Sequence, residues 1–210
     1  MVSKCQEKKL RIVRMPFQPE NKERFLPLSI TDRSIVLVGL MGAGKTCIGR
    51  RLANKINWEF IDTDAEIEAA ADCTIEEIFN VHGEEYFRKG EQRVIARLLK
   101  NSRQVLATGG GAFQNIATRK NIRNNAISIW LKADLDILLK RISRRNNRPL
   151  LNTGNRRKIL KNLIKKRYPA YSEADIVINS GEEGPNETVQ KILNALIKYG
   201  KVFETQDQKK

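Results

Sequence analysis

The feature that most constrains this chain is a glycine-rich loop between a short apolar run and an amphipathic segment. The loop spans residues 39–46 and matches the phosphate-binding pattern G-x-x-x-x-G-K-[ST]. The β-branched run at 34–38 predicts a buried parallel strand. Apolar residues at helical spacing follow the loop: Ile48, Leu52, Ala53 and Ile56. Strand, loop and helix in this order favour a nucleotide-binding loop over the alternative, a glycine turn before an ordinary helix.

The residue types in the loop suit a phosphate chain. Glycines let the backbone approach phosphate oxygens without steric clash, and the loop amides and the helix N-terminus direct partial positive charge at them. Lys45 adds a full charge near the β and γ phosphates, and Thr46 offers a hydroxyl to a magnesium ion. The loop therefore predicts nucleotide binding, without saying what the nucleotide is used for.

The chain of 210 residues suits one α/β domain, because strand-like apolar runs alternate with helical ones. Residues 1–32 are polar and basic, contain prolines and lack periodicity, so we expect a flexible extension there. We expect Gly200 to end the last helix and residues 200–210 to form a disordered tail. The folded domain is then predicted at 33–199.

The formal net charge of +15 raises the hypothesis of a nucleic-acid-binding ATPase. However, residues 137–172 contain many Lys and Arg and no Asp or Glu, and a basic block in one region equally suits a polyphosphate and an anionic substrate. No RNA-recognition, zinc-finger or basic-zipper signature is present. We therefore expect no nucleic acid partner.

The three cysteines lack C-x-x-C spacing and only one histidine is present, so a structural zinc site is not expected. Sparse cysteine usage suits a reducing cytosol. No apolar run approaches the roughly 20 residues that span a bilayer, and the N-terminus has no apolar signal core. The sequence predicts a cytoplasmic protein with no membrane partner.

Two carboxylates, Asp62 and Asp64, follow the second strand-like run at 58–61. In an extended segment such residues project to the same side, and sites of open α/β sheets lie at the carboxyl ends of strands. One carboxylate would hold magnesium, and the other would accept a proton or hydrogen bond from a substrate hydroxyl. The alternative for Asp64 is a helix N-cap.

Further strand-like runs at 105–107, 126–131 and 175–178 complete a set of five. The first of these ends in Gly109-Gly110-Gly111, which would let another group approach the backbone, although a flexible turn is the alternative. The arginine-rich segment at 144–154 fits a lid that supplies arginines to a transferring phosphoryl group, and equally a solvated loop. Taken alone, Arg88 predicts only a solvated helix face.

Together these segments closely resemble the shikimate kinase family. The segments that carry the resemblance cover nearly all of residues 33–199 in the family's order: 39–46, Phe-Ile-Asp-Thr-Asp at 60–64, Gly-Glu-Glu-Tyr-Phe-Arg at 83–88, Ala-Thr-Gly-Gly-Gly-Ala at 107–112, Arg-Pro-Leu-Leu at 148–151 and Arg-Tyr-Pro-Ala-Tyr at 167–171. The phosphate loop alone is shared with many proteins, whereas the whole set is far more specific.

The resemblance implies a P-loop kinase of three α/β/α layers, with a five-stranded parallel sheet like that of nucleoside monophosphate kinases and a mobile lid at about 144–155. It implies Mg²⁺-assisted phosphorylation of the shikimate 3-hydroxyl by ATP, giving shikimate 3-phosphate and ADP, in the chorismate pathway to aromatic amino acids. The expected partners are ATP and shikimate, and the expected state is a monomer.

The resemblance also implies roles for individual residues. Gly42, Ala43, Gly44, Lys45, Thr46 and Cys47 would cradle the ATP phosphates, with Arg141 against adenine and Arg148 reaching the phosphates from the lid. Asp64, Arg88, Gly109, Gly110, Gly111 and Arg167 would bind shikimate, the two arginines gripping its carboxylate. Thr46 and Asp62, the latter through water, would hold Mg²⁺. Lys45, Asp64 and Arg148 would be the catalytic residues, Asp64 orienting the attacking hydroxyl and taking its proton or only orienting it.

One departure from the family pattern is Cys47, where a threonine is commoner, so a hydroxyl that could touch the α-phosphate is missing. Two alternatives to the family's own reaction stay open at this point. One is a related small-molecule kinase such as a gluconate kinase, whose substrate is also a hydroxylated carboxylate. The other is a non-catalytic binding protein with the same fold.

Overall fold

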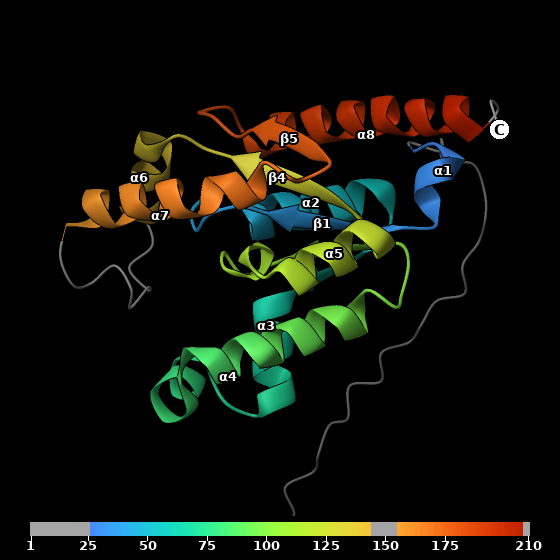
Figure 1. The fold of residues 1–210 in the computed structure, drawn as a ribbon. Coiled ribbons are helices and arrows are strands. Elements are labelled where there is room, and N and C mark those ends of the chain that lie inside the picture. The colour runs from blue at the N-terminus through green and yellow to red at the C-terminus, as the bar shows by residue number, and fades with distance from the viewer. Residues whose placement is uncertain (1–25, 144–154, 208–210) are drawn as a thin grey trace, which may run out of the picture.

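The centre of the molecule is a parallel β-sheet, seen in a computed structural model that describes residues 26–143 and 155–207 (Figure 1). Its strands lie in the order β2-β3-β1-β4-β5, and all neighbouring pairs are parallel. The bounds are β1 (Ser34–Val38), β2 (Glu59–Asp62), β3 (Gln104–Ala107), β4 (Ala126–Lys132) and β5 (Ile176–Asn179). The predicted five-stranded parallel sheet is confirmed.

The three inner strands are apolar because helices cover both of their faces. Every residue of β1 and β3 is buried, and so is β4 up to its last residue. Leu37 of β1 and Asp62 of β2 both pair with Ala107 of β3. The loops that follow these three strands therefore leave the sheet at the same edge, where an α/β protein places its site.

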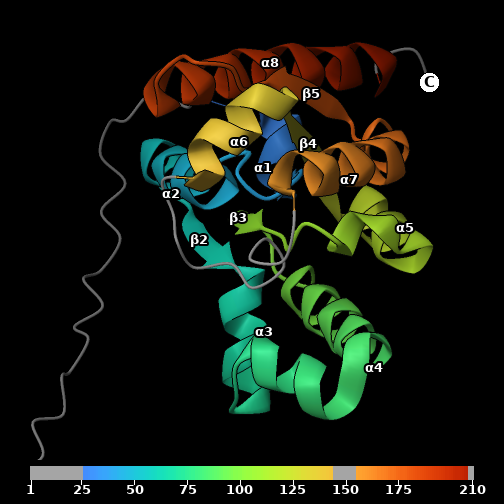
Figure 2. The ribbon, with the colours of Figure 1, turned by 90° about the vertical axis from the view of Figure 1, so that its left-hand side faces the viewer.

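Helices form the two outer layers (Figure 2). Helices α2 (Lys45–Ile56) and α8 (Pro185–Asp207) pack together on one face of the sheet. On the other face α5 (Ile116–Asn125) packs against β4. The short helix η1 (Ala112–Gln114) contacts both α5 and α7 (Arg156–Tyr171). Helix α6 (Leu135–Ser143) packs against α7. The three-layer architecture is thus confirmed.

Helices α3 (Thr63–Ala71) and α4 (Ile75–Leu98) pack against each other in a lobe at the lower end of both views (Figures 1 and 2). This α3–α4 lobe has a small apolar cluster of its own, formed by Ile67, Ile78 and Phe87. Thr74 begins α4 with a capping box, accepting from the Glu77 amide at 3.2 Å and donating to the Glu77 carboxylate at 2.7 Å.

Gly83 kinks α4 within its length. Its φ of 80° and ψ of 176° lie far from helical values, in a region that favours glycine. The kink changes the direction of the helix just before the turn that carries Arg88.

Both ends of the folded part extend beyond the boundaries predicted at 33 and 199. Gly200 does not end α8, which continues to Asp207. A glycine is needed here because the N-terminal segment crosses the helix: a Cβ on Gly200 would lie 2.7 Å from Pro27 Cγ. Leu26 and Ile30 are buried, and α1 (Leu28–Thr31) packs against α8. The remainder of the predicted extension, residues 1–25, and residues 208–210 lie outside the described part of the chain.

The sequence predicts no apolar run long enough to span a bilayer, and the helices of the structure can be compared with that prediction. Among residues 26–143 and 155–207, none of the helices combines the length and apolar character that crossing a bilayer requires.

Candidate active site

A pocket of about 770 Å³ lies at the carboxyl edge of the sheet. The phosphate loop, the ends of β2 and β3, helix α6 and the segment before α8 line it. Most of the residues predicted from the sequence are among its lining: Gly42, Gly44, Lys45, Thr46, Cys47, Asp62, Asp64, Gly109, Gly110 and Arg141. The structure therefore brings together residues that are up to about a hundred positions apart in the chain.

The phosphate loop has the backbone that its glycines allow. Gly42 and Gly44 have φ of 82° and 97°, in the left-handed region. Gly44 is the N-cap of α2, so the first turn of that helix faces the pocket. Lys45 folds back over the loop, its Nζ donating to the carbonyls of Gly39 at 2.8 Å and Leu40 at 3.0 Å. The loop thus holds a positive charge beside a helix N-terminus, which is the environment an anionic phosphate needs.

Asp62 connects the phosphate loop to the start of α3. Its Oδ2 accepts from the Thr46 hydroxyl at 3.0 Å, and its Oδ1 accepts from the Asp64 amide at 3.2 Å as the N-cap of α3. The capping alternative therefore applies to Asp62, whereas the sequence suggested it for Asp64. The extended Asp-Thr-Asp segment was also a wrong prediction, because α3 begins at Thr63, yet both carboxylates still line the pocket.

The pair formed by Thr46 and Asp62 fits a magnesium ion. Hydroxyl and carboxylate oxygens are hard ligands, and Mg²⁺ is usually bound by one or two carboxylates together with water and substrate phosphates. Within the described residues, no group of three or more His, Cys, Asp or Glu side chains is placed to hold a metal by itself. The donors present thus suit an ion that shares its coordination with a nucleotide.

The triple glycine is the point where three helices direct charged side chains at one loop. A Cβ on Gly109 would lie 2.7 Å from Asp64 Oδ1, and one on Gly110 would lie 3.3 Å from an Arg167 guanidinium nitrogen. A Cβ on Gly111 would lie 2.6 Å from Arg88 Cζ. Asp64, Arg88 and Arg167 come from α3, α4 and α7, and only glycines leave room for all three against the loop.

Arg167 and Tyr171 of α7 both bind the carbonyl of Gly110. The Arg167 guanidinium donates to it at 2.9 Å, and the Tyr171 hydroxyl donates to it as well. A tyrosine hydroxyl is protonated at neutral pH even at its ordinary pKa of about 10. Burial raises the pKa of Tyr171 further, to about 12, so this hydroxyl is a donor over the whole physiological range. The end of α7 is thereby fixed against the glycine loop.

Glu91 is a buried acid of this site that our sequence analysis did not identify. Glu91 is only 2% exposed, and its Oε2 accepts a hydrogen bond from Arg88 at 2.7 Å. Among the described residues its Oε1 has no hydrogen-bond partner, and it faces Gly109. Burial raises the pKa of the Glu91 carboxyl, with Arg88 opposing the shift. The i,i+3 spacing of Arg88 and Glu91 on a helix was the available signal.

Arg141 lies in the pocket wall between α6 and the segment before α8. It donates to Gly181 O at 2.5 Å, to Ser180 Oγ at 2.9 Å and to Ala43 O at 3.3 Å. Cys47 lines the same pocket and is a free thiol. Arg148 and the predicted lid lie outside the described residues, apart from Asn155, which caps α7 through the amides of Arg157 and Lys158.

Comparisons with known proteins agree on one family. The family model described as shikimate kinase matches residues 41–197. The shikimate kinase of Paramagnetospirillum magneticum is 52% identical over 167 residues, covering 80% of this chain and 86% of that protein. The shikimate kinase of Bartonella quintana is 50% identical over 171 residues, covering 81% of each chain.

Solved structures give the same result. A shikimate kinase from Acinetobacter baumannii in complex with shikimate has a TM-score of 0.76 and 39% identity, covering 80% of this chain and 94% of that one. A gluconokinase from Sinorhizobium meliloti has a TM-score of 0.58 and 16% identity, covering 84% of this chain and 98% of that one. At that identity, the second match shows a shared fold alone.

Proposed function

Because this chain belongs to the shikimate kinase family, we propose that its pocket holds ATP over the phosphate loop and shikimate over the glycine loop at 109–111. The chain is a phosphotransferase of that family, which uses ATP to phosphorylate shikimate in the pathway to aromatic amino acids.

The observation that carries the assignment is the convergence of Asp64, Arg88 and Arg167 on one glycine loop beside the phosphate loop. The two arginines supply planar pairs of donors, which suit a carboxylate better than a lysine does. Asp64 supplies an acceptor, which suits a hydroxyl. A small acid bound with its carboxylate between the arginines would therefore present a hydroxyl to Asp64, close to the γ-phosphate.

On the acceptor side, Asp64 orients the attacking 3-hydroxyl by accepting its hydrogen bond. Phosphoryl transfer passes through a loose transition state, so it depends more on positioning than on early proton removal. Glu91 holds Arg88 in place through their 2.7 Å contact and keeps its guanidinium facing Gly111. These groups together fix the direction of attack.

On the nucleotide side, the loop from Gly42 to Cys47 holds the phosphates, and Lys45 stabilises the charge on the group being transferred. Arg141 forms the wall against which adenine would lie. The role of Arg148 and of a lid at about 144–155 remains a prediction from the sequence. Closure of such a lid would exclude water and suppress hydrolysis of ATP.

We propose Mg²⁺ as the metal, with Thr46 and Asp62 as the residues that would hold it. When bound, the ion neutralises charge on the phosphate oxygens. We propose that the protein acts as a monomer, as the family resemblance implies.

A coupled assay of ADP release tests this proposal. Purified protein is given ATP and Mg²⁺ with shikimate, with gluconate or with no acceptor. We expect shikimate alone to stimulate ADP release above the rate without acceptor. A stimulation by gluconate and none by shikimate would favour the related small-molecule kinase instead, and no stimulation by either would refute the catalytic assignment.

A further inference from the structure

We propose that Arg119, outside the pocket, is a positioning residue that sets the distance between Arg167 and the glycine loop, and so the affinity for the acceptor acid. This inference rests on the proposed function, because it assigns the effect of Arg119 to binding of shikimate.

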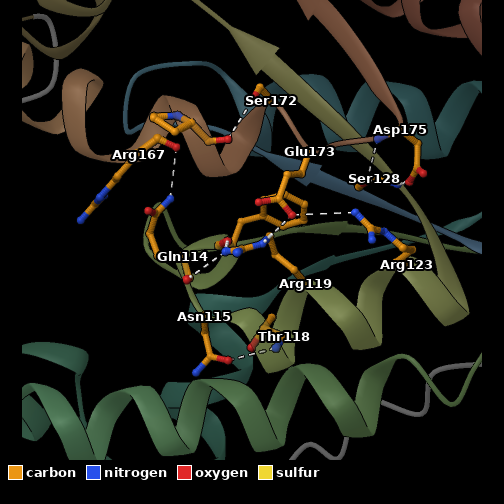
Figure 3. A network of polar contacts seen from close by, with 12 residues as sticks. Gln114, Asn115, Thr118, Arg119, Arg123, Ser128, Arg167, Ser172, Glu173 and Asp175 are labelled. Atoms are coloured by element: carbon orange, nitrogen blue, oxygen red, sulfur yellow. Dashed lines mark hydrogen bonds and ion pairs between the residues drawn. The ribbon is translucent and has the colours of Figure 1, made fainter.

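Arg119 joins two segments that are far apart in the chain (Figure 3). Its NH1 group donates to the carbonyls of Phe113 at 2.8 Å and Gln114 at 3.0 Å, and its Nε donates to Glu173 at 3.1 Å. Phe113 and Gln114 belong to η1, which begins directly after Gly111, whereas Glu173 follows the end of α7 by two residues. We call this set of three bonds the Arg119 clasp.

The same two segments also meet at the pocket. The Gln114 side chain donates to Arg167 O at 3.3 Å (Figure 3). The Arg167 side chain donates to Gly110 O at 2.9 Å. The Arg119 clasp is thus a second connection between η1 and the end of α7, made by residues that do not line the pocket. Without it, the contacts at the pocket would have to fix the loop by themselves while also adapting to a bound acid.

The solvent exposure of the side chains shows which bonds of the Arg119 clasp contribute most to holding the loop. The Arg119 side chain is 15% exposed and that of Glu173 is 45% exposed, so the ion pair alone is screened by water and contributes little. The carbonyls of Phe113 and Gln114 depend on Arg119, because loss of a donor leaves part-buried acceptors unpaired. We infer that Glu173 orients the guanidinium and that the two carbonyl bonds hold the loop.

The same helix offers a matched control. Arg123 lies one turn further along α5 and approaches Glu173 at 3.8 Å, but its side chain is 65% exposed and donates no hydrogen bond to η1 in the described contacts. Replacing Arg123 removes the same charge from the same helix and leaves the two carbonyl bonds intact. A difference between the two positions therefore reports on the clasp and not on net charge.

The test compares Arg119→Met, Arg119→Lys, Glu173→Gln and Arg123→Met by steady-state kinetics and thermal unfolding. For Arg119→Met we expect the KM for shikimate to rise about tenfold, the scale of one moderate interaction, with the KM for ATP within twofold of wild type and most of kcat retained. Arg119→Lys should lie between, because lysine keeps the charge and lacks the planar fork. Glu173→Gln and Arg123→Met should stay within about threefold.

Two results would overturn the inference. In one, Arg119→Met lowers the melting temperature or the active fraction while its KM for shikimate stays within twofold, which is the behaviour of a merely structural residue. In the other, the KM values for ATP and shikimate rise together. If Arg119→Met does not accumulate as folded protein, the same comparison is made with Arg119→Lys: the change in its KM for shikimate against the change in its KM for ATP. A wild-type enzyme inactive on shikimate would refute the proposed function, and this inference with it, before any variant is compared.

Discussion

Adding one methyl group at Gly109 separates positioning from chemistry at the acceptor side, because it moves Asp64 without changing it. A Cβ at this residue would lie 2.7 Å from Asp64 Oδ1 and 2.8 Å from Glu91 Oε1, whereas ordinary contact begins at about 3.4 Å. The Asp64 carboxylate must then retreat by about 0.7 Å, and a misplacement of about 1 Å can cost a hundredfold in rate. We expect Gly109→Ala to lower kcat by about tenfold to a hundredfold.

The assay is coupled ADP release at saturating ATP, with shikimate varied. Gly90→Ala is the matched control, because it is the same change on α4 at a position where a Cβ would meet nothing within 4 Å. The control should keep wild-type turnover. If Gly109→Ala also kept kcat within twofold of wild type while remaining folded, the claim that Asp64 acts through its exact distance from the glycine loop would be refuted.

Three further predictions concern single side chains. Asp64→Asn should lower turnover by at least about a hundredfold in the same assay, the usual scale for a lost positioning or acid–base group, and activity within twofold of wild type would remove Asp64 from the mechanism. Burial raises the pKa of Glu91 above 4.5, so above that pH the folded state binds more protons than the unfolded state, and the stability that this group contributes is lost as pH rises through the raised pKa. Urea unfolding at a series of pH values should therefore show a smaller loss of unfolding free energy for Glu91→Gln than for wild type over that window. Equal slopes of unfolding free energy against pH for the two proteins would contradict the shift. Cys47→Thr supplies a hydroxyl facing the nucleotide and should lower the KM for ATP by about twofold to tenfold, on the scale of one hydrogen bond, whereas an unchanged KM would mean that no such bond forms.

The fold and half of the site could be predicted because their signals are local. The phosphate loop is continuous in sequence, and the strand before it and the helix after it have distinct periodicities. The capping box at Thr74 and the kink at Gly83 are likewise encoded within a few residues. Asp64 also had a local signal, because it follows a strand-like run together with Asp62. The roles of Arg88 and Arg167 followed from the family resemblance alone, since neither has a distinctive local signal.

What the sequence could not predict depends on contacts between distant segments. Gly200 has the local signature of a helix end, but its role is to let Pro27 cross α8. Glu91 appears in sequence as an ordinary helix-surface acid, and only packing of α4 against the glycine loop buries it. Arg119 is similar, because the carbonyl and carboxylate groups to which it donates belong to other elements of the fold.

The small, separate apolar cluster of the α3–α4 lobe has a consequence for how such an enzyme diversifies. Asp64 and Arg88 belong to the helices of that lobe. The phosphate loop instead packs in the main core, together with β1 and α2. Substitutions that repack Ile67, Ile78 or Phe87 would re-aim two of the acceptor contacts and leave ATP handling largely untouched. Selectivity for the acid and use of the nucleotide can therefore change independently, because they depend on different parts of the chain.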